Sequence, residues 1–471
     1  MKTVPIILAG ILSLVIAGCA STNPKAAFND VDKTVMARTG QQMHGMSNDV
    51  VNVLLKTNLT AQAAVTIALL NNHSLQAEFE EIGISQADLA QASRLQNIEI
   101  AGSWRFPNRP PSAADVEYSA AGNLLDLLTL PARKKVAARN LEQTKLQVAD
   151  KVLQLDADTQ TAFYDLQAQM ELGKRLNTIV EANEASVDFA KRQYDAGNIN
   201  DLTLHEQQAP AVQSHLDLMN AKADVQAGRE RLNRLLGLSG EQINWQIADE
   251  LPSLPTNEPP LENLESLAVN QRLDLVAKRN QAESIAAALR LKKHTRFIPG
   301  ATIGVDTERT PDGQRVTGPT LDLELPIFDQ GHAAIAKLTA EFQQAKDNYA
   351  AQEVNVRSEV REARVELLAA REAVEFSQKN LLPLRKQILG ETLLQYDAMQ
   401  KNSFDLLIAK EREQNAEQTS IAALRDYWIA RVALERAVGG RLAMEPAAPA
   451  PAKMDSEPMQ MTMPMSHEHQ H

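Results

Sequence analysis

The sequence predicts a mainly α-helical chain with a small β part, in which long helical hairpins occur twice and are joined to four strands. The first observation is a strand-to-helix transition in the second half of the chain. Leu321–Leu325 alternates apolar and acidic side chains, the pattern of a strand with one face in water. After Pro326 and Gly331 the pattern becomes helical and stays so to about Ala398. A helix of that length would measure roughly 100 Å.

The second observation is an internal repeat of about 200 residues. Three pairs of short segments correspond at nearly constant spacing: 72–75 with 272–275, 194–196 with 396–398, and 232–237 with 434–439. Two tandem structural repeats explain this spacing better than many small ones.

Each half has the same order of expected elements. A helix (59–96 and 261–294) precedes two strands (98–106 and 117–130; 301–309 and 317–325), a very long helix (131–196 and 331–398) and a returning helix. Pro131 suits the first turn of the long helix. Asp201 and Ser403 are expected to cap the returning helices, which should end near Gly237 and at 439–440.

Three proline-containing segments modify this plan. Pro210 and Pro383 lie inside expected helices and should kink or interrupt them. Residues 251–260 contain four prolines and are expected to link the two halves.

The first residues indicate export. Lys2 precedes a short apolar run that ends at Ala17-Gly18-Cys19, the features of a cleaved secretory signal. Residues 16–19 resemble a bacterial lipobox, so Cys19, the only cysteine, is expected to become a lipidated (palmitate-bearing) N-terminus. Ala20 in place of aspartate points to sorting to the outer membrane. The alternative is an ordinary signal peptide with a chance cysteine.

Composition excludes several classes of protein. After the signal no apolar run approaches 18 residues, so no transmembrane helix is expected and any crossing must use strands. The net charge of −12 disfavours nucleic acid as a partner. No phosphate loop, nucleophile elbow or zinc-protease motif occurs, which disfavours an enzyme.

Four strands cannot close a barrel alone, and an open sheet edge is not tolerated in lipid. The strands are therefore expected to join a shared barrel, with about eight strands from two copies or about twelve from three. Twelve strands enclose a hollow space, whereas eight are filled by side chains.

At this point a resemblance can be stated. The sequence resembles the outer membrane efflux protein family, the TolC-like exit ducts of tripartite pumps, in its lipoprotein branch. The matching segments are 59–60, 64–65, 68–72, 194–197, 232–237, 272–275 and 325–331, and the likeness covers Leu59–Leu442. Leu273 departs from the family's proline, and Met399 stands where the first tip has Gly197.

The resemblance implies a homotrimer with a 12-strand barrel in outer-membrane lipid and a helical tunnel in the periplasm. It further implies passive export of substrate delivered by a periplasmic adaptor and an inner-membrane pump. The family closes its periplasmic mouth near the second tip, where Asp405 matches an aspartate that faces the threefold axis. Tyr396 and Asp201 complete the expected gate, although Asp201 and Asp405 can also serve as caps that complement a helix dipole.

The C-terminal tail distinguishes this sequence. Every odd position from 459 to 471 is Met or His: Met459, Met461, Met463, Met465, His467, His469 and His471. Thioethers select Cu(I) and, being soft ligands, Ag(I), so the tail is expected to bind these ions transiently, with no resident cofactor. The alternatives are a low-complexity tail without a ligand, or an added sequence.

The sequence therefore predicts an outer-membrane exit duct, for copper, silver or other heavy-metal ions. The alternatives are a non-channel periplasmic coiled-coil lipoprotein, and a duct for drugs or organic solutes with an incidental tail. The expected segments are a signal (1–18), an anchored N-terminal segment (19–58), repeat 1 (59–250), a linker (251–260), repeat 2 (261–442) and the tail (443–471).

Overall fold

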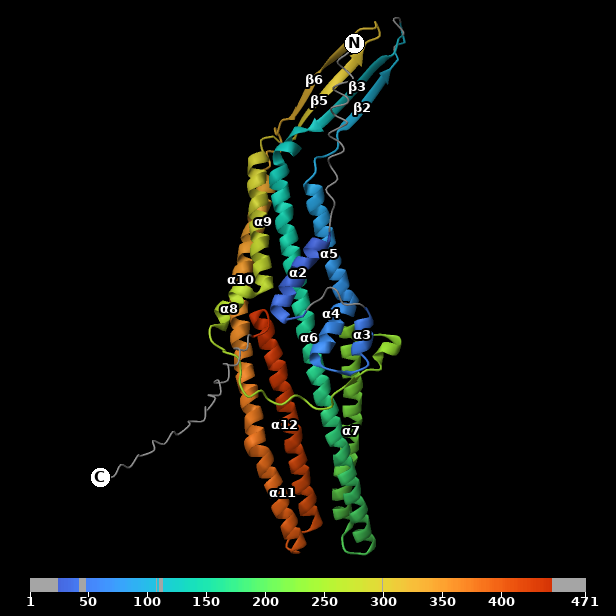
Figure 1. Cartoon of the computed structure of the whole chain (residues 1–471), viewed down its shortest axis with the longest axis vertical. Helices are drawn as coiled ribbons and strands as arrows, with labels where there is room; N and C mark the ends of the chain where they lie inside the picture. Colours follow the sequence, from blue (N-terminus) through green and yellow to red (C-terminus); the bar gives the residue numbers. More distant parts are fainter. Residues whose placement is uncertain (1–23, 42–47, 107, 110–112, 299, 443–471) are drawn as a thin grey trace, which may run out of the picture.

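A computed structural model describes residues 24–41, 48–106, 108–109, 113–298 and 300–442 as an elongated helical bundle with a β-sheet at one end (Figure 1). The first half comprises α2 (Pro24–Thr39), α3 (Asn48–Leu54), β1 (Asn58–Leu59), α4 (Ala61–Asn71), α5 (His73–Ala92), β2 (Glu99–Arg105), β3 (Asp115–Asn123), α6 (Leu124–Asp195), α7 (Asp201–Leu236), a 3₁₀ turn (Gly240–Ile243) and β4 (Gln246–Ile247). The second comprises α8 (Leu264–Gln271), α9 (Leu273–Thr295), β5 (Gly300–Arg309), β6 (Arg315–Glu324), α10 (His332–Phe376), a π-helical turn (Ser377–Leu381), α11 (Leu382–Asp397) and α12 (Ser403–Val438).

The expected repeat is visible in this order. The returning helices α7 and α12 are each 36 residues long and lie 202 positions apart, by subtraction of 201 from 403. Both end in a left-handed glycine as expected, at Gly237 and Gly439. Helix α6 has 72 residues and is therefore about 108 Å long.

The single helices expected over 59–96 and 261–294 are each two helices, which corrects the prediction. Asn72 leaves the helical conformation, with φ −73° and ψ 109°, and Arg272 does the same in the second half. Asn72 Oδ1 accepts a hydrogen bond from the Leu75 amide (3.0 Å), and its Nδ2 donates to the Leu235 carbonyl (2.9 Å). One side chain thus caps the new helix and ties it to α7.

The strand expected over 117–130 ends at Asn123, so residues 124–130 are helical. Asn123 Oδ1 accepts from the Asp126 amide (3.0 Å) and starts α6 there. The buried Asp126 carboxylate accepts from the Gln96 amide (2.9 Å) and pairs with Arg133 (2.8 Å). Pro131 is therefore the eighth residue of the helix and not in its first turn.

The expected caps also need correction. Asn200 and Asn402 are the N-caps of α7 and α12, while Asp201 and Ser403 are the first helical residues. Helix α7 continues through Pro210 without a break. The long helix of the second half is interrupted as expected near Pro383, because the π-helical turn directly precedes it.

The core lies at mid-height, where the ends of the first half meet. Strand β1 pairs in parallel with β4, with Leu59 opposite Ile247. Trp245 beside them is 2% exposed, donates to Asn233 Oδ1 (2.8 Å) and packs under the Arg229 guanidinium, 4.1 Å from the ring centre. The beginning and the end of the first repeat are thereby joined before the chain crosses to the second repeat.

Among the described helices none is both long and apolar enough to cross a bilayer.

Candidate functional site: the sheet and the helical tips

The sheet at one end of the molecule has two chemically different faces. Its four strands are antiparallel in the order β2-β3-β5-β6, so the strand pairs of the two repeats join between β3 and β5. Ile303 lies opposite Leu321, and Val305 lies opposite Ala120 on one side and Pro319 on the other. Side chains that share a row share a face of the sheet.

One face is apolar and exposed. It carries Ile100, Trp104, Tyr118, Ile303, Val305, Leu321 and Leu323, which are between 48% and 80% exposed. Trp104 lies edge-on to Tyr118, with ring centres 5.7 Å apart. A soluble protein rarely leaves so much contiguous apolar surface open, so this face is made for an apolar environment or a partner.

The opposite face is acidic. It carries seven carboxylates and one arginine: Glu99, Asp115, Glu117, Asp306, Glu308, Asp322, Glu324 and Arg105. Glu117 and Glu308 lie directly opposite each other across β3 and β5, and Arg105 pairs with Glu117 at 2.7 Å. Sequence reasoning found only Asp322 and Glu324, because the alternation is regular in β6 but interrupted by small residues in the other strands.

The helical tips lie at the end of the molecule remote from the sheet (Figure 1). In the first tip Gly197 takes the left-handed conformation (φ 74°), and the Asn198 amide donates back to the Gln193 carbonyl (2.8 Å). In the second tip Met399 takes it (φ 58°), and Gln400 donates to Gln395 in the same way. The two turns have one backbone plan, but the second holds a side chain, 94% exposed, where the first has none.

Asp405 belongs to a capping box at the start of α12. Its amide donates to Asn402 Oδ1 (2.9 Å), and its carboxylate accepts from the Asn402 amide (3.3 Å), with Lys401 Nζ at 3.9 Å. Asp405 is thus the third residue of α12 and completes the cap formed by Asn402, a position in which its carboxylate also complements the helix dipole. Tyr396 lies 38% exposed just before the same turn.

At the first tip, Asp201 accepts a hydrogen bond from the Tyr194 hydroxyl, and this bond raises the pKa of Tyr194. The two hairpins are joined near their tips by Phe189 of α6 and Phe404 of α12, with ring centres 6.4 Å apart. Higher up, Arg175 pairs with Glu417 across the same boundary at 3.3 Å. The expected gate residues thus occupy two tips that belong to adjoining hairpins.

The expected linker is attached along its length. On the α6 side, the Leu251 amide donates to the Glu171 carboxylate (3.3 Å), and Gln167 Nε2 donates to the Glu250 carbonyl just before the linker (3.2 Å). On the α12 side, Trp428 Nε1 donates to the Pro252 carbonyl (2.9 Å). Residues 251–260 have no regular secondary structure but bridge the two hairpins.

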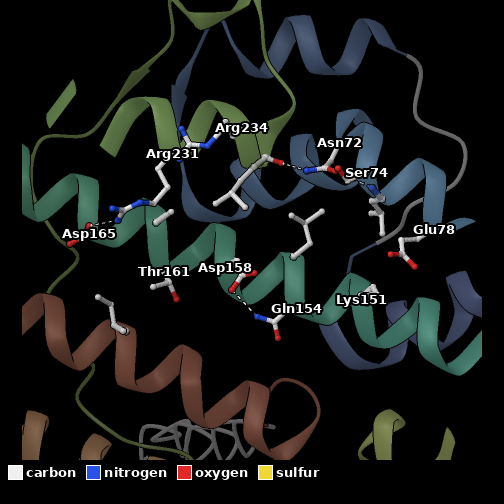
Figure 2. A pocket seen from close by; sticks show the side chains of 15 residues that line it. Asn72, Ser74, Glu78, Lys151, Gln154, Asp158, Thr161, Asp165, Arg231 and Arg234 are labelled. Carbon is white, nitrogen blue, oxygen red and sulfur yellow. Dashed lines mark hydrogen bonds and ion pairs between the residues drawn. The ribbon is translucent and has the colours of Figure 1, made fainter. Parts of the chain in front are cut away.

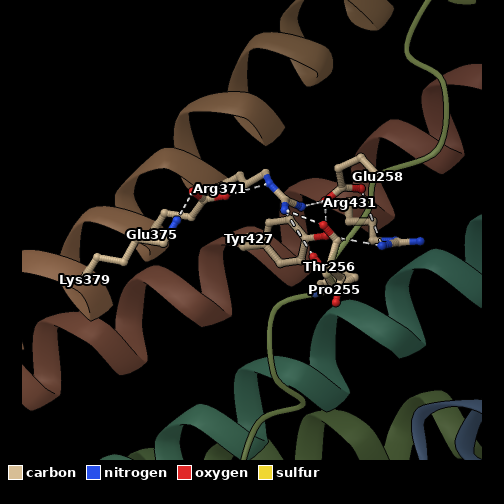
Figure 3. A network of polar contacts seen from close by, with 8 residues as sticks. All are labelled: Pro255, Thr256, Glu258, Arg371, Glu375, Lys379, Tyr427 and Arg431. Carbon is tan, nitrogen blue, oxygen red and sulfur yellow. Dashed lines mark hydrogen bonds and ion pairs between the residues drawn. The ribbon is translucent and has the colours of Figure 1, made fainter.

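Glu258 is the centre of this attachment (Figure 3). Its carboxylate accepts a hydrogen bond from the Tyr427 hydroxyl and pairs with Arg371 (2.6 Å) and Arg431 (3.6 Å). Tyr427 is fully buried, and the side chains of the other three residues are less than one-fifth exposed. Arg371 also donates to the carbonyl of Pro255 (3.2 Å). Burial, with the hydrogen bond to Glu258, raises the pKa of Tyr427 to about 12, so the phenol is a hydrogen-bond donor at neutral pH.

An open cavity of about 700 Å³ lies between α5, α6, α7 and α12 (Figure 2). Of the six charged residues that line it, Arg231 and Asp165 form an ion pair (3.3 Å). Gln154 likewise donates to Asp158 (2.8 Å). This lining offers no nucleophile next to a base and no site for chemistry.

The remaining expected sites lie outside the described residues: Cys19, and the tail residues Met459, Met461, Met463, Met465, His467, His469 and His471. Within the ranges that the structure describes, no group of three or more His, Cys, Asp or Glu side chains could hold a metal ion.

Comparison with known proteins adds independent findings. Residues 64–238 match the family model described as outer membrane efflux protein. The cobalt-zinc-cadmium resistance protein CzcC of Cupriavidus metallidurans is 21% identical over 384 residues, which cover 81% of this chain and 90% of CzcC.

Two solved structures are similar along most of the chain. The Campylobacter jejuni CmeC outer membrane channel superimposes with a TM-score of 0.71 at 17% identity, over 82% of this chain and 87% of CmeC. CusC, studied for conformational changes accompanying folding and transmembrane channel formation, gives a TM-score of 0.68 at 16% identity, over 85% and 96%. Residues 64–238 thus match the outer membrane efflux protein family, and the chain as a whole has the fold of TolC-like channels.

Proposed function

We propose that this protein is the passive outer-membrane exit duct of a tripartite efflux system and that its cargo is heavy-metal cations, including copper or silver. Three copies would contribute four strands each to a 12-strand barrel, and their helices would form the periplasmic tunnel. A periplasmic adaptor and an inner-membrane pump would deliver the cargo.

The observation that carries this proposal is the two-faced sheet. An exposed apolar face suits lipid, and an acidic face on the other side of the same strands suits a water-filled lumen. Two edge strands, β2 and β6, remain available for pairing with neighbouring copies. A tethered coiled coil without a channel would gain nothing from such a sheet.

The acidic face also supports metal cations as cargo. Seven carboxylates against one arginine make a lumen that attracts cations and repels anions. The cobalt-zinc-cadmium resistance protein CzcC is a relative in sequence, which agrees with metal efflux. The tail at 459–471 would collect soft ions through its alternating methionines and histidines.

The gate is assigned to Asp405, Tyr396 and Asp201. Three copies of Asp405 converging on an axis would repel one another, and bound cations would relieve that repulsion. Its capping box does not oppose this role, because the second carboxylate oxygen has only Lys401 near it, at 3.9 Å. Cys19 would anchor the N-terminal segment to the membrane through lipid. The chain would then be divided into this anchored segment (19–58), repeat 1 (59–250), the linker (251–260), repeat 2 (261–442) and the tail (443–471).

The test is conductance of the purified full-length protein in planar bilayers. Wild type should form cation-selective channels, and Asp322→Asn with Glu324→Gln should lower the ratio of cation to anion permeability. Glu206→Gln with Glu262→Gln removes two exposed carboxylates outside the sheet and serves as the matched control. Absence of conductance from a water-soluble chain would refute the duct, and unselective channels would favour organic solutes as cargo.

The tail needs its own experiment. Deletion of 454–471 should lower copper or silver tolerance in a strain that depends on this pump, and replacement of the four methionines by serine should do the same. Unchanged tolerance, with no Cu(I) bound by the tail peptide, would remove the tail from the proposal while leaving the duct intact.

A further inference from the structure

Exposed apolar side chains lie on three chain segments where the sheet joins the helices. Leu127 and Leu128 belong to the first turns of α6, Phe297 and Ile298 follow α9, and Ile327 and Phe328 precede α10. All six are at least half exposed, and Phe328 is fully exposed. We call these six residues the apolar girdle.

Next to the girdle, on the side of the helices, lies a group of basic side chains: Lys134, Lys135, Arg290, Lys292, Lys293 and Arg296. None of the six makes an ion pair with any residue that the structure describes. Helices α6 and α9 run antiparallel and in register here, since Ser284 donates to Asn140 (2.7 Å), so the two basic segments lie at one height. We call these six residues the basic collar.

The collar contrasts with the rest of the chain. The chain carries a net charge of −12, yet three acidic groups near the collar are engaged: Asp126 with Arg133 (2.8 Å), Glu283 with Arg139, and Asp329 with the Gly331 amide (2.8 Å). Unpaired positive charge beside exposed apolar side chains is the pattern of a surface that meets anionic headgroups. Arg296 also covers the Phe297 ring at 4.2 Å, which joins the two surfaces.

A recess opens at the same height. A cavity of about 540 Å³ lies between α5, α6, α9 and α10, lined mainly by apolar side chains such as Val136 and Leu291. Arg133, Lys292 and Thr295 line it with polar groups that can donate to a phosphate, and Asp88 is its one carboxylate. A headgroup on the collar can therefore be approached from more than one helix.

We propose that the basic collar binds the headgroups of anionic phospholipids in the membrane leaflet that faces the helices, while the apolar girdle lies among their acyl chains. The inference rests on the proposed function, because it requires the strands to lie in the outer membrane. To that function it adds the class of lipid that the protein binds and the depth to which the protein is inserted in the membrane. The collar, through Lys134, Lys135, Lys292 and Lys293, sets where the membrane ends.

The experiment compares three forms of the full-length protein. Lys134→Gln, Lys135→Gln and Lys293→Gln together remove three exposed collar charges. Lys191→Gln, Lys222→Gln and Lys386→Gln remove three exposed charges from the helices below, as the matched control. Each form is reconstituted into phosphatidylethanolamine vesicles with and without phosphatidylglycerol, and the lipids retained after detergent extraction are counted by native mass spectrometry.

Wild type and the control should retain phosphatidylglycerol in excess over its share of the vesicle, and high salt should abolish the excess. The collar variant should lose it, because each basic side chain near an anionic surface contributes a factor of about five. The arginine versions of the same three substitutions should restore it, which excludes misfolding as the cause. Equal retention by the collar variant and wild type would overturn the proposal.

Conductance separates this proposal from the one on which it rests. Channels that form in phosphatidylethanolamine alone, with no phosphatidylglycerol excess in wild type, overturn the collar and leave the duct standing. A wild-type protein that enters neither kind of vesicle overturns both.

Discussion

Removal of the Glu258 carboxylate should loosen the crossing between the two hairpins. Glu258, Arg371 and Arg431 have side chains only 13%, 19% and 14% exposed, so Glu258→Ala leaves two largely desolvated arginines without their shared partner. Loss of one member of a buried ion pair typically costs about 3–5 kcal/mol. Because the remaining exposure lets water reach the arginines, we expect the lower end of that range, about 3 kcal/mol.

The assay is denaturant unfolding of the detergent-solubilised protein followed by circular dichroism, paired with limited proteolysis of 251–260 by a protease of broad specificity. Glu258→Ala should lower the unfolding midpoint and speed cleavage of the linker. Glu262→Ala, an exposed glutamate four residues on, is the matched control and should change neither. If Glu258→Ala unfolds within about 0.5 kcal/mol of the control, the reasoning from the buried network is wrong.

Three further predictions concern single positions. Met399→Gly should stabilise the second tip by about 1 kcal/mol, because it relieves a left-handed non-glycine conformation; slower amide exchange at the turn would show this, and faster exchange would contradict it. Gly237→Ala should cost several times the roughly 1 kcal/mol expected for Gly197→Ala, since an added Cβ overlaps a backbone carbonyl only at the former; equal unfolding midpoints would disprove this. Burial raises the pKa of Glu435 above its ordinary 4.5, so the folded state holds that proton more tightly and stability falls as pH rises from the unfolded pKa through the folded one. Glu435→Gln should remove that loss and exceed wild type in stability near neutral pH, while Glu411→Gln on the exposed side of α12 should not; a fall in stability for Glu435→Gln would refute the sign.

The sequence predicted the repeat, the four strands and the ends of the returning helices because those features depend on local patterns. The strands β2, β5 and β6 begin and end within two residues of the prediction, since each alternates or is bounded by turn residues. Gly237 and Gly439 end their helices for a reason visible in the residue type alone.

The errors arose where distant contacts decide the local conformation. Residues 124–130 are apolar enough for a strand, but the Gln96 amide and Arg133 fix Asp126 in a helical first turn. The break at Asn72 depends on the Leu235 carbonyl of another helix, 163 residues away. Likewise no sequence pattern revealed that Glu258 of the linker would meet two arginines and a tyrosine.

The candidate site was predicted in part for the same reason. The alternation in β6 exposed Asp322 and Glu324, but the other five carboxylates of the acidic face became a set only through the strand register. Asp405 was proposed from its place after Tyr396, a prediction that stands as one, and its capping box agrees with the helix start that the sequence indicated one residue away.

The interruption of one long helix but not the other has a consequence for assembly. Helix α6 runs unbroken for 72 residues, whereas its counterpart is divided by the π-helical turn at Ser377–Leu381. A closed ring of three chains would then alternate three continuous long helices with three that are interrupted by a π-helical turn. A periplasmic partner that bound around such a ring would meet two different kinds of groove, so the arrangement of its subunits would be no more than threefold symmetric.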